Sequence, residues 1–315
     1  MERYGVPYRG SKNKIAKWVV DNLPKGETFV DLFAGGCAVT HAAMLSGKWQ
    51  NFITNDIGDA PQLFADAVAG KYHDESRWIS REDFFKLKNT DRYVSLCWSF
   101  GNNRKDYMYA KTLEPWKKAL WYARKLNDTS LLEEMGIHSD GSSKDILAHK
   151  EEYKRLYIRW HQSRHDCVPA SLQSLESLQR LESLQRLQSL ERLQSLESLQ
   201  RLQSLELDYR QVTIPDNAIV YADPPYRGTG CDGYAGGAFD YKAFDKWLAE
   251  VPFMVIVSEY VAPAGCVEIA SKHKQRCMGT GNKGGCDTEK LFVQERFVEQ
   301  YRHMMDRNES LVLTA

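Results

Sequence analysis

Short strand-like runs that stop abruptly at glycine, proline or acidic residues are the most regular pattern in the chain. They cover residues 29–32, 51–55, 219–222 and 253–257. Runs of this kind are typical of strands buried in a sheet. Residues 15–23, 38–45 and 239–250 instead place apolar side chains at helical spacing. The chain therefore predicts an α/β fold in which helices pack on a sheet of short buried strands.

Residues 60–165 differ, because they show helical patterns and no clear β alternation. Basic and aromatic residues are interleaved along this segment, which is typical of a face that contacts phosphates. The alternative is an ordinary solvated helix face. The residues that we expect to contact nucleic acid are Asn102, Asn103, Arg104, Lys105, Lys117 and Lys118.

Residues 171–206 form a repeat in which leucine occupies every third position from Leu172 to Leu205. An α-helix would spread these leucines around its axis, and 3₁₀ helices are rarely this long. We therefore predict stacked coils that bury one leucine per triplet, although the composition favours a helix. A spacer or partner-binding arm is one interpretation, and a tolerated expansion at a permissive loop is the one we favour.

Composition narrows the class of protein. The 42 basic and 42 acidic residues balance, so any nucleic-acid contact must depend on a local basic surface. Seven cysteines without a Cys-x-x-Cys pair argue against a zinc site and a disulfide framework, and we expect no metal. No apolar run is long enough to span a membrane, so we expect a cytoplasmic protein.

The strongest candidate for chemistry is the turn Asp223-Pro224-Pro225-Tyr226, which ends the strand-like run 219–222. Two prolines cannot continue a central strand, so they present a stiff corner at its carboxyl end. Asp223 and the Pro224 carbonyl can accept both N–H groups of an amino group on a flat base, and Tyr226 can stack on its ring. A proline turn that merely closes a core strand is the alternative.

A second candidate site begins at the run 29–32 and its glycine turn. Asp31, Phe33, Ala34 and Gly35 lie here, and glycine lets a backbone approach a ligand closely. Asp56 ends the next predicted strand, where a carboxylate typically accepts from ribose hydroxyls, or else caps a helix. Tyr8 and Lys12, beside a predicted helix start, suit a carboxylate or an adenine ring, unless they form only a surface turn.

In this order, the elements from Tyr8 to Lys12, Asp31 to Gly36, residues 60–165 and Asp223 to Tyr226 resemble the Dam-type (D12 class) adenine-N6 DNA methyltransferases, notably phage-like members. Cys37 departs from the family pattern, which has a second glycine there. The resemblance implies a Rossmann-like class I fold with a mostly parallel seven-stranded sheet and an inserted helical recognition domain. It assigns residues 1–60 and 207–315 to catalysis, 61–170 to DNA recognition and 171–206 to the repeat.

The resemblance also implies an activity. A methyl group would pass from S-adenosylmethionine to N6 of an adenine flipped out of double-stranded DNA, in a bacterial cell or phage-infected host. Tyr8, Lys12 and Asp56 would contact the cofactor, while Asp223 and Tyr226 would serve catalysis and base stacking. Cytosine-N4 or RNA adenine methylation stays open, as does a non-catalytic scaffold built on the repeat. A nicotinamide oxidoreductase is disfavoured because the third glycine is missing. The recognition sequence, a restriction partner and the oligomeric state stay undetermined.

Overall fold

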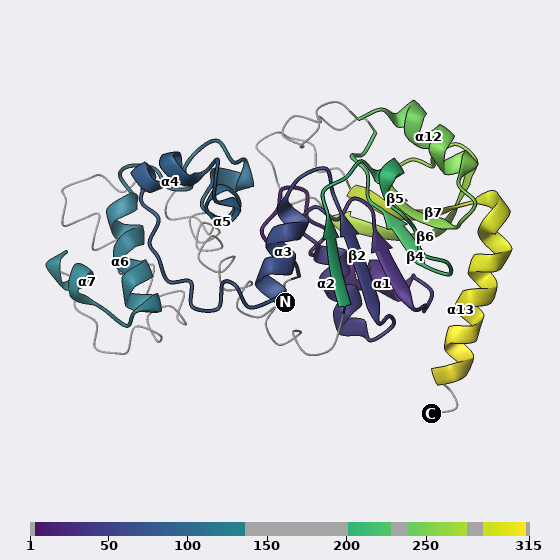
Figure 1. The fold of residues 1–315 in the computed structure, drawn as a ribbon, viewed down its shortest axis with the longest axis horizontal. Coiled ribbons are helices and arrows are strands. Elements are labelled where there is room, and N and C mark those ends of the chain that lie inside the picture. The colour runs from purple at the N-terminus through teal and green to yellow at the C-terminus, as the bar shows by residue number, and fades with distance from the viewer. Residues whose placement is uncertain (1–3, 136–200, 228–238, 276–285, 313–315) are drawn as a thin grey trace. The chain divides into compact units, whose positions relative to one another are not determined.

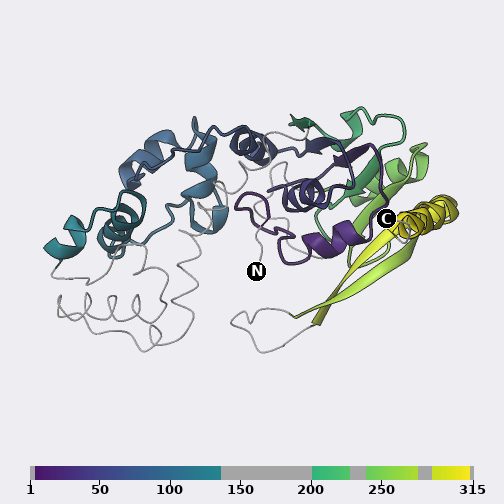
Figure 2. The same ribbon diagram turned by 90° about the horizontal axis from the view of Figure 1, so that it is seen from below.

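The computed structural model describes residues 4–135, 201–227, 239–275 and 286–312. The chain divides into two compact units. The first, called here the sheet unit, contains residues 4–71 and all described residues from 201 onward. The second, the helical unit, contains the described residues 72–135. Figures 1 and 2 show both units.

A seven-stranded sheet forms the centre of the sheet unit, in the order β3-β2-β1-β4-β5-β7-β6 (Figure 1). Strands β3, β2, β1, β4 and β5 pair in parallel, whereas β7 is antiparallel to both of its neighbours. The predicted α/β fold with a mostly parallel seven-stranded sheet is therefore confirmed, and β7 is the strand that runs antiparallel to its neighbours. The strands are β1 (Thr28–Asp31), β2 (Asn51–Asn55), β3 (Arg201–Leu205), β4 (Ile219–Ala222), β5 (Val255–Glu259), β6 (Cys266–Gln275) and β7 (Cys286–Gln294).

Helices cover both faces of this sheet. On one face, Phe244 and Leu248 of α12 (Tyr241–Glu250) pack with Val30, Val220 and Val255 in one hydrophobic cluster. The other side holds α1 (Ala16–Asp21) and α2 (Ala38–Ser46), which contact each other. The remaining elements of the unit are α3 (Ala60–Val68), the short 3₁₀ helices η4 (Tyr209–Gln211) and η5 (Glu295–Phe297), and α13 (Val298–Val312).

The last residues of the leucine repeat form strand β3. We predicted stacked coils for residues 171–206, but Arg201–Leu205 form a strand that pairs with β2 along its whole length, from Asn51 opposite Arg201 to Asn55 opposite Leu205. Leu205 packs against the core cluster, so the hydrophobic effect favours this position of the strand beside β2. The predicted coils of residues 171–200 lie outside the described residues.

One further boundary differs from the prediction. Helix α3 was assigned to the helical insertion, yet it contacts β3, and its Phe64 ring lies 5.9 Å from the ring of His41 in α2. It therefore belongs to the sheet unit. Strand β6 extends to Gln275, which pairs with Cys286 of β7. Figure 2 shows these two strands as a long ribbon.

The helical unit is built around large aromatic side chains. Its elements are α4 (Arg81–Leu87), α5 (Arg92–Cys97), η1 (Phe100–Asn102), α6 (Glu114–Lys125) and α7 (Ser130–Glu134). The fully buried rings of Trp98 and Trp121 lie 5.2 Å apart and both pack against Trp78. Helix α6 buries Trp116, Leu120 and Ala123, at spacings of four and three residues that give it one apolar face. The predicted helical character thus holds for the described part of this segment.

Candidate active site

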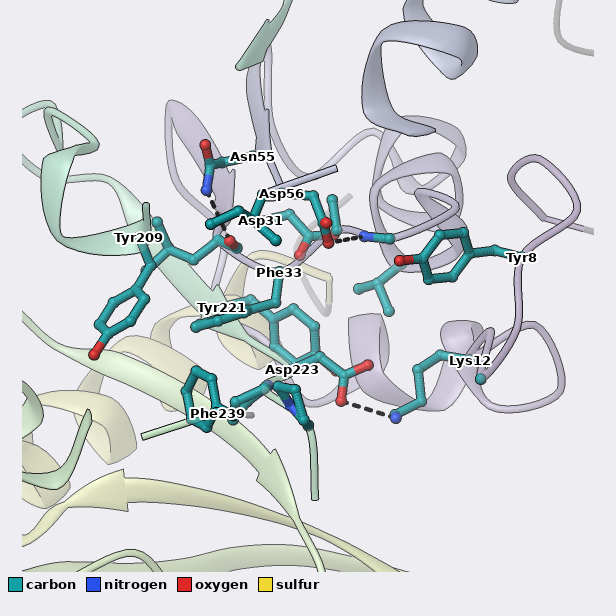
Figure 3. A pocket seen from close by; sticks show the side chains of 18 of the residues that line it. Tyr8, Lys12, Asp31, Phe33, Asn55, Asp56, Tyr209, Tyr221, Asp223 and Phe239 are labelled. Carbon is teal, nitrogen blue, oxygen red and sulfur yellow. Dashed lines mark hydrogen bonds and ion pairs between the residues drawn. The ribbon is translucent and has the colours of Figure 1, made fainter. Parts of the chain in front are cut away.

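A cavity of about 560 Å³ opens at the carboxyl ends of β1, β2 and β4 in the sheet unit (Figure 3). This is the usual place for ligands in an open α/β sheet, and the volume is typical of a small-molecule site. The structure brings every predicted cofactor-binding and catalytic residue to its wall: Tyr8, Lys12, Asp31, Phe33, Ala34, Gly35, Asp56, Asp223, Pro224, Pro225 and Tyr226.

The carboxylate of Asp56 fixes the glycine turn that follows β1. One carboxylate oxygen of Asp56 accepts from the Gly35 N–H at 3.0 Å and the other from the Gly58 N–H at 2.9 Å. Cys37 follows at φ 57°, in the left-handed region that favours glycine. The fold thus keeps the turn even though a cysteine occupies its last position, and the buried thiol of Cys37 contributes to the core.

The N-terminal segment closes over this turn. The Val6 N–H donates to the Gly36 carbonyl at 2.8 Å. A Cβ atom on Gly35 would come within 2.8 Å of the Tyr8 ring, closer than real contacts allow, and the residue has φ +48°. Gly35 is therefore required both by its backbone conformation and by the position of Tyr8.

Asp31 is a buried carboxylate at the end of β1, and it accepts from the Thr40 hydroxyl at 2.8 Å. Burial raises the pKa of Asp31 to about 7, and the nearby charges of Asp223 and Asp56 add to this, while the hydrogen bonds from Thr40 and the Phe33 N–H oppose it. A carboxyl in this state would be stabilised in its ionised form by a cation in the cavity.

Asp223 forms an ion pair with Lys12, whose Nζ lies 2.8 Å from its Oδ1 (Figure 3). The same ammonium stands 4.3 Å from the centre of the Tyr226 ring. Burial raises the pKa of Asp223, although the charge of Lys12 opposes this rise. Desolvation lowers the pKa of Lys12, but the charges of Asp223 and Glu289 outweigh it, so the net shift is upward. We expected Lys12 to contact the cofactor. In the structure it also pairs with Asp223 of the predicted catalytic turn.

Hydrogen bonds hold Tyr226 in place, and they involve residues that were not predicted from the sequence. The Tyr226 hydroxyl donates to Oε1 of Glu289 on β7, and the Ser258 hydroxyl donates to the same oxygen at 3.2 Å. The turn beyond Tyr226 is fixed by the Arg227 N–H, which donates to Glu259 at 3.1 Å. The sequence did not indicate a role for Glu289, because it lies 63 residues from Tyr226 and only sheet pairing brings the two together.

Asp208 and Tyr209 were also missed, and both line the cavity. They follow β3 as Asp56 follows β2, so the signal is an acidic residue after a parallel strand. The leucine repeat conceals that strand. Hydrogen bonding to Arg210 lowers the pKa of Asp208. Tyr209 packs 5.2 Å from Phe33 and 5.5 Å from Phe244, so an aromatic cluster holds this wall in place.

Four of the predicted nucleic-acid contacts, Asn102–Lys105, lie in one ordered turn of the helical unit. Asn102 and Arg104 both have φ 60°. The Asn103 side chain accepts from the N–H groups of Lys105 and Asp106, and Ser99 accepts from the Arg104 N–H. Side chain to backbone bonds of this kind fix a turn.

The two lysines of α6 differ from this turn. Lys118 is half-buried, with its ammonium 5.7 Å from the Tyr122 ring. Lys117 is only 3% exposed, and its ammonium lies 6.0 Å from the Tyr109 ring. The prediction that Lys117 contacts nucleic acid is therefore wrong for this structure, because its position on α6 faces the core of the unit.

Residues 8–140 match the family model described as D12 class N6 adenine-specific DNA methyltransferase. No curated protein matches the chain. None of the described helices is long and apolar enough to cross a membrane, and the described residues contain no cluster of three or more His, Cys, Asp or Glu side chains suited to a metal. The match ends before Asp223, so this residue enters the argument through its place in the cavity.

Proposed function

Residues 8–140 match the model of the D12 class N6 adenine-specific DNA methyltransferase family, and on this premise we propose that the chain belongs to that family and that the cavity holds S-adenosylmethionine beside the target adenine. We assign the activity of that family, transfer of a methyl group to N6 of adenine in DNA, to this chain as part of the proposal. The individual roles of the residues that line the cavity are our proposal.

The charged, polar and apolar side chains that line the cavity suit this cofactor. Asp31, Asp56 and Asp208 supply carboxylates for a cationic and hydroxyl-bearing molecule, whereas a dinucleotide would bring phosphates against them. Asp56 accepts two backbone N–H groups, and a carboxylate has further lone pairs for ribose hydroxyls. Tyr8, Phe33 and the exposed side chain of Ile57 supply apolar surface for the adenine moiety. When bound, S-adenosylmethionine supplies an electrophilic methyl group on a positively charged sulfur.

The Asp223-Pro224-Pro225-Tyr226 turn receives the target base. The base must leave the duplex to reach a cavity at the end of a sheet. Asp223 and the Pro224 carbonyl then accept the N6 hydrogens, so that the nitrogen lone pair is directed at the methyl carbon. As the new N–C bond forms and the S–C bond breaks, N6 loses one proton, for which the carboxylate of Asp223 is the acceptor. The raised pKa of Asp223 suits that step.

Contact with DNA outside the flipped base is assigned to the turn Asn102–Lys105. Asn and Arg side chains are suited to base edges, and Lys105 is an exposed charge suited to a phosphate. The ordered backbone of the turn lowers the entropy cost of presenting these groups.

The observation that carries this proposal is that Asp223 shares one cavity with Asp31 and Asp56, although the turns come from distant parts of the sequence. The test is methylation of unmethylated genomic DNA by Asp223→Asn and Asp223→Ala, with the nucleosides of the digested product resolved by mass spectrometry. We expect N6-methyladenine from the wild type and a loss of at least about 100-fold in both variants, since Asp223→Ala removes the group that orients the nucleophile and Asp223→Asn removes the carboxylate that accepts the proton.

The matched control is Asp21→Asn, because Asp21 is an exposed carboxylate paired with Lys17 on α1. It should methylate like the wild type. Full activity in Asp223→Ala would overturn the assignment of the site. Formation of N4-methylcytosine would contradict adenine as the target base, and a preference for RNA would contradict DNA as the substrate.

A further inference from the structure

Glu289 is a fully buried carboxylate below the cavity wall, and the mechanism above leaves it without a role. Its Oε1 accepts from Tyr226 and Ser258, while its Oε2 is buried and has no hydrogen-bond partner among the described residues. A buried carboxylate with an unused oxygen costs folding free energy. A packed apolar side chain would be the less costly way to fill this position on β7.

Lys12 connects Glu289 to the proposed chemistry. Its Nζ lies 2.8 Å from Oδ1 of Asp223 and 3.8 Å from Oε1 of Glu289, so one ammonium stands between two carboxylates. In the structure this ammonium donates to Oδ1 of Asp223 and so occupies one of its acceptor positions. An incoming amino group needs such a position, and Lys12 must then find another acceptor, because an unpaired buried ammonium is strongly disfavoured.

We propose that Glu289 is a positioning residue: it fixes the Tyr226 ring through the tyrosine hydroxyl, and it takes up the Lys12 ammonium when the target amino group binds to Asp223. The inference rests on the proposed function, since it assigns Glu289 a part in the same reaction. It differs from a purely structural role, in which Glu289 would only join β7 to Ser258 of β5.

The test is a double-mutant cycle on methylation of genomic DNA, with Tyr226→Phe, Glu289→Ala and their combination. Each rate is divided by the fraction of protein that binds S-adenosylmethionine in calorimetry, so that misfolded protein does not enter the comparison. Removing a hydrogen bond to a charged group corresponds to a kcat loss of about 10- to 100-fold. We expect a loss of that size in Glu289→Ala, and the double variant should be no slower than the slower single variant.

Glu289→Gln keeps the size of the side chain and an oxygen for the Tyr226 hydroxyl, but it removes the charge that would take up Lys12. We therefore expect it to recover part of the kcat lost in Glu289→Ala while its KM for DNA stays above that of the wild type. A structural anchor alone predicts no rise of KM in this variant. The matched control is Glu268→Gln, since Glu268 is partly exposed on β6 and pairs with Lys290 at 2.8 Å. Its kinetics should be unchanged.

Two outcomes would overturn the inference. One is a kcat for the double variant equal to the product of the two single effects, which would make Tyr226 and Glu289 independent. The other is wild-type kinetics in both Glu289 variants beside an inactive Asp223→Asn, which would remove this inference and leave the proposed function intact. Full activity in Asp223→Asn would instead remove the proposed function, and this inference with it.

Discussion

At the scale of single residues, the site is a group of acids placed close together with little opposing charge. The cavity is lined by three cations, Lys12, Arg9 and Arg210, and by five aspartates, Asp31, Asp56, Asp208, Asp223 and Asp240. Lys12 is paired with Asp223, and Arg210 with Asp208. The carboxyl of Asp31 responds to this by its raised pKa. The site therefore carries an electrostatic cost in the absence of a cationic ligand, and that cost should depend on pH.

The prediction concerns the free energy of unfolding of Asp31→Asn. The pKa of Asp31 is about 7 in the folded protein and about 3.9 in an unfolded chain, so ionisation disfavours the folded state. The contribution of Asp31 is most favourable below pH 4 and is lost as the pH rises towards 7. Relative to the wild type, the variant should gain on the order of 2 kcal/mol more at pH 8 than at pH 5.

Urea unfolding at the two pH values measures this difference directly. The Oδ1 of asparagine can still accept from Thr40, so the packing around β1 is kept. Asp21→Asn, in which an exposed carboxylate is removed, should show no such difference between pH 5 and pH 8. A constant offset between wild type and Asp31→Asn across this range would contradict the raised pKa.

At the scale of secondary structure, strands ending in acids were predictable and strands concealed by repetition were not. The runs at β1, β2 and β4 are apolar and end at turn residues, so local patterns were sufficient to place Asp31, Asp56 and Asp223 near one sheet edge. Strand β3 has the same composition as the triplets before it, so its local sequence does not distinguish it from them. Its pairing with β2 depends on tertiary contacts. The same holds for Glu289, which acquires its partners only when β7 joins β5.

Strand β3 allows a prediction that compares two of its own residues. Leu205 is partly buried against the core cluster, whereas Gln203 is exposed on the same strand. We expect Leu205→Ala to lower the free energy of unfolding by about 1–2 kcal/mol, less than for a fully buried leucine. Gln203→Ala should stay within about 0.5 kcal/mol of the wild type. Both values come from urea unfolding, and equal effects of the two substitutions would mean that this triplet is not packed on the sheet.

At the scale of the whole molecule, the two units divide the work of the proposed reaction. Every residue that lines the cavity belongs to the sheet unit, while the turn Asn102–Lys105 belongs to the helical unit. Cofactor affinity and DNA affinity should therefore respond to different substitutions. A protein in which one unit carried both functions would show the two affinities falling together.

The last prediction uses Arg104→Ala combined with Lys105→Ala. Each phosphate contact releases counterions, so its loss lowers the slope of log affinity for DNA against log salt concentration by about 0.9. If both side chains contact phosphates, the slope should fall by about 2, and if Arg104 contacts a base edge instead, it should fall by about 1 with a loss of sequence preference. The affinity for S-adenosylmethionine, measured by calorimetry, should not change, because neither residue reaches the wall of the cavity. Lys86→Ala is the matched control within the helical unit, since its exposed ammonium is already paired with Glu82 at 2.6 Å. An unchanged salt slope in the double variant would place DNA contact elsewhere on the helical unit or on the sheet unit.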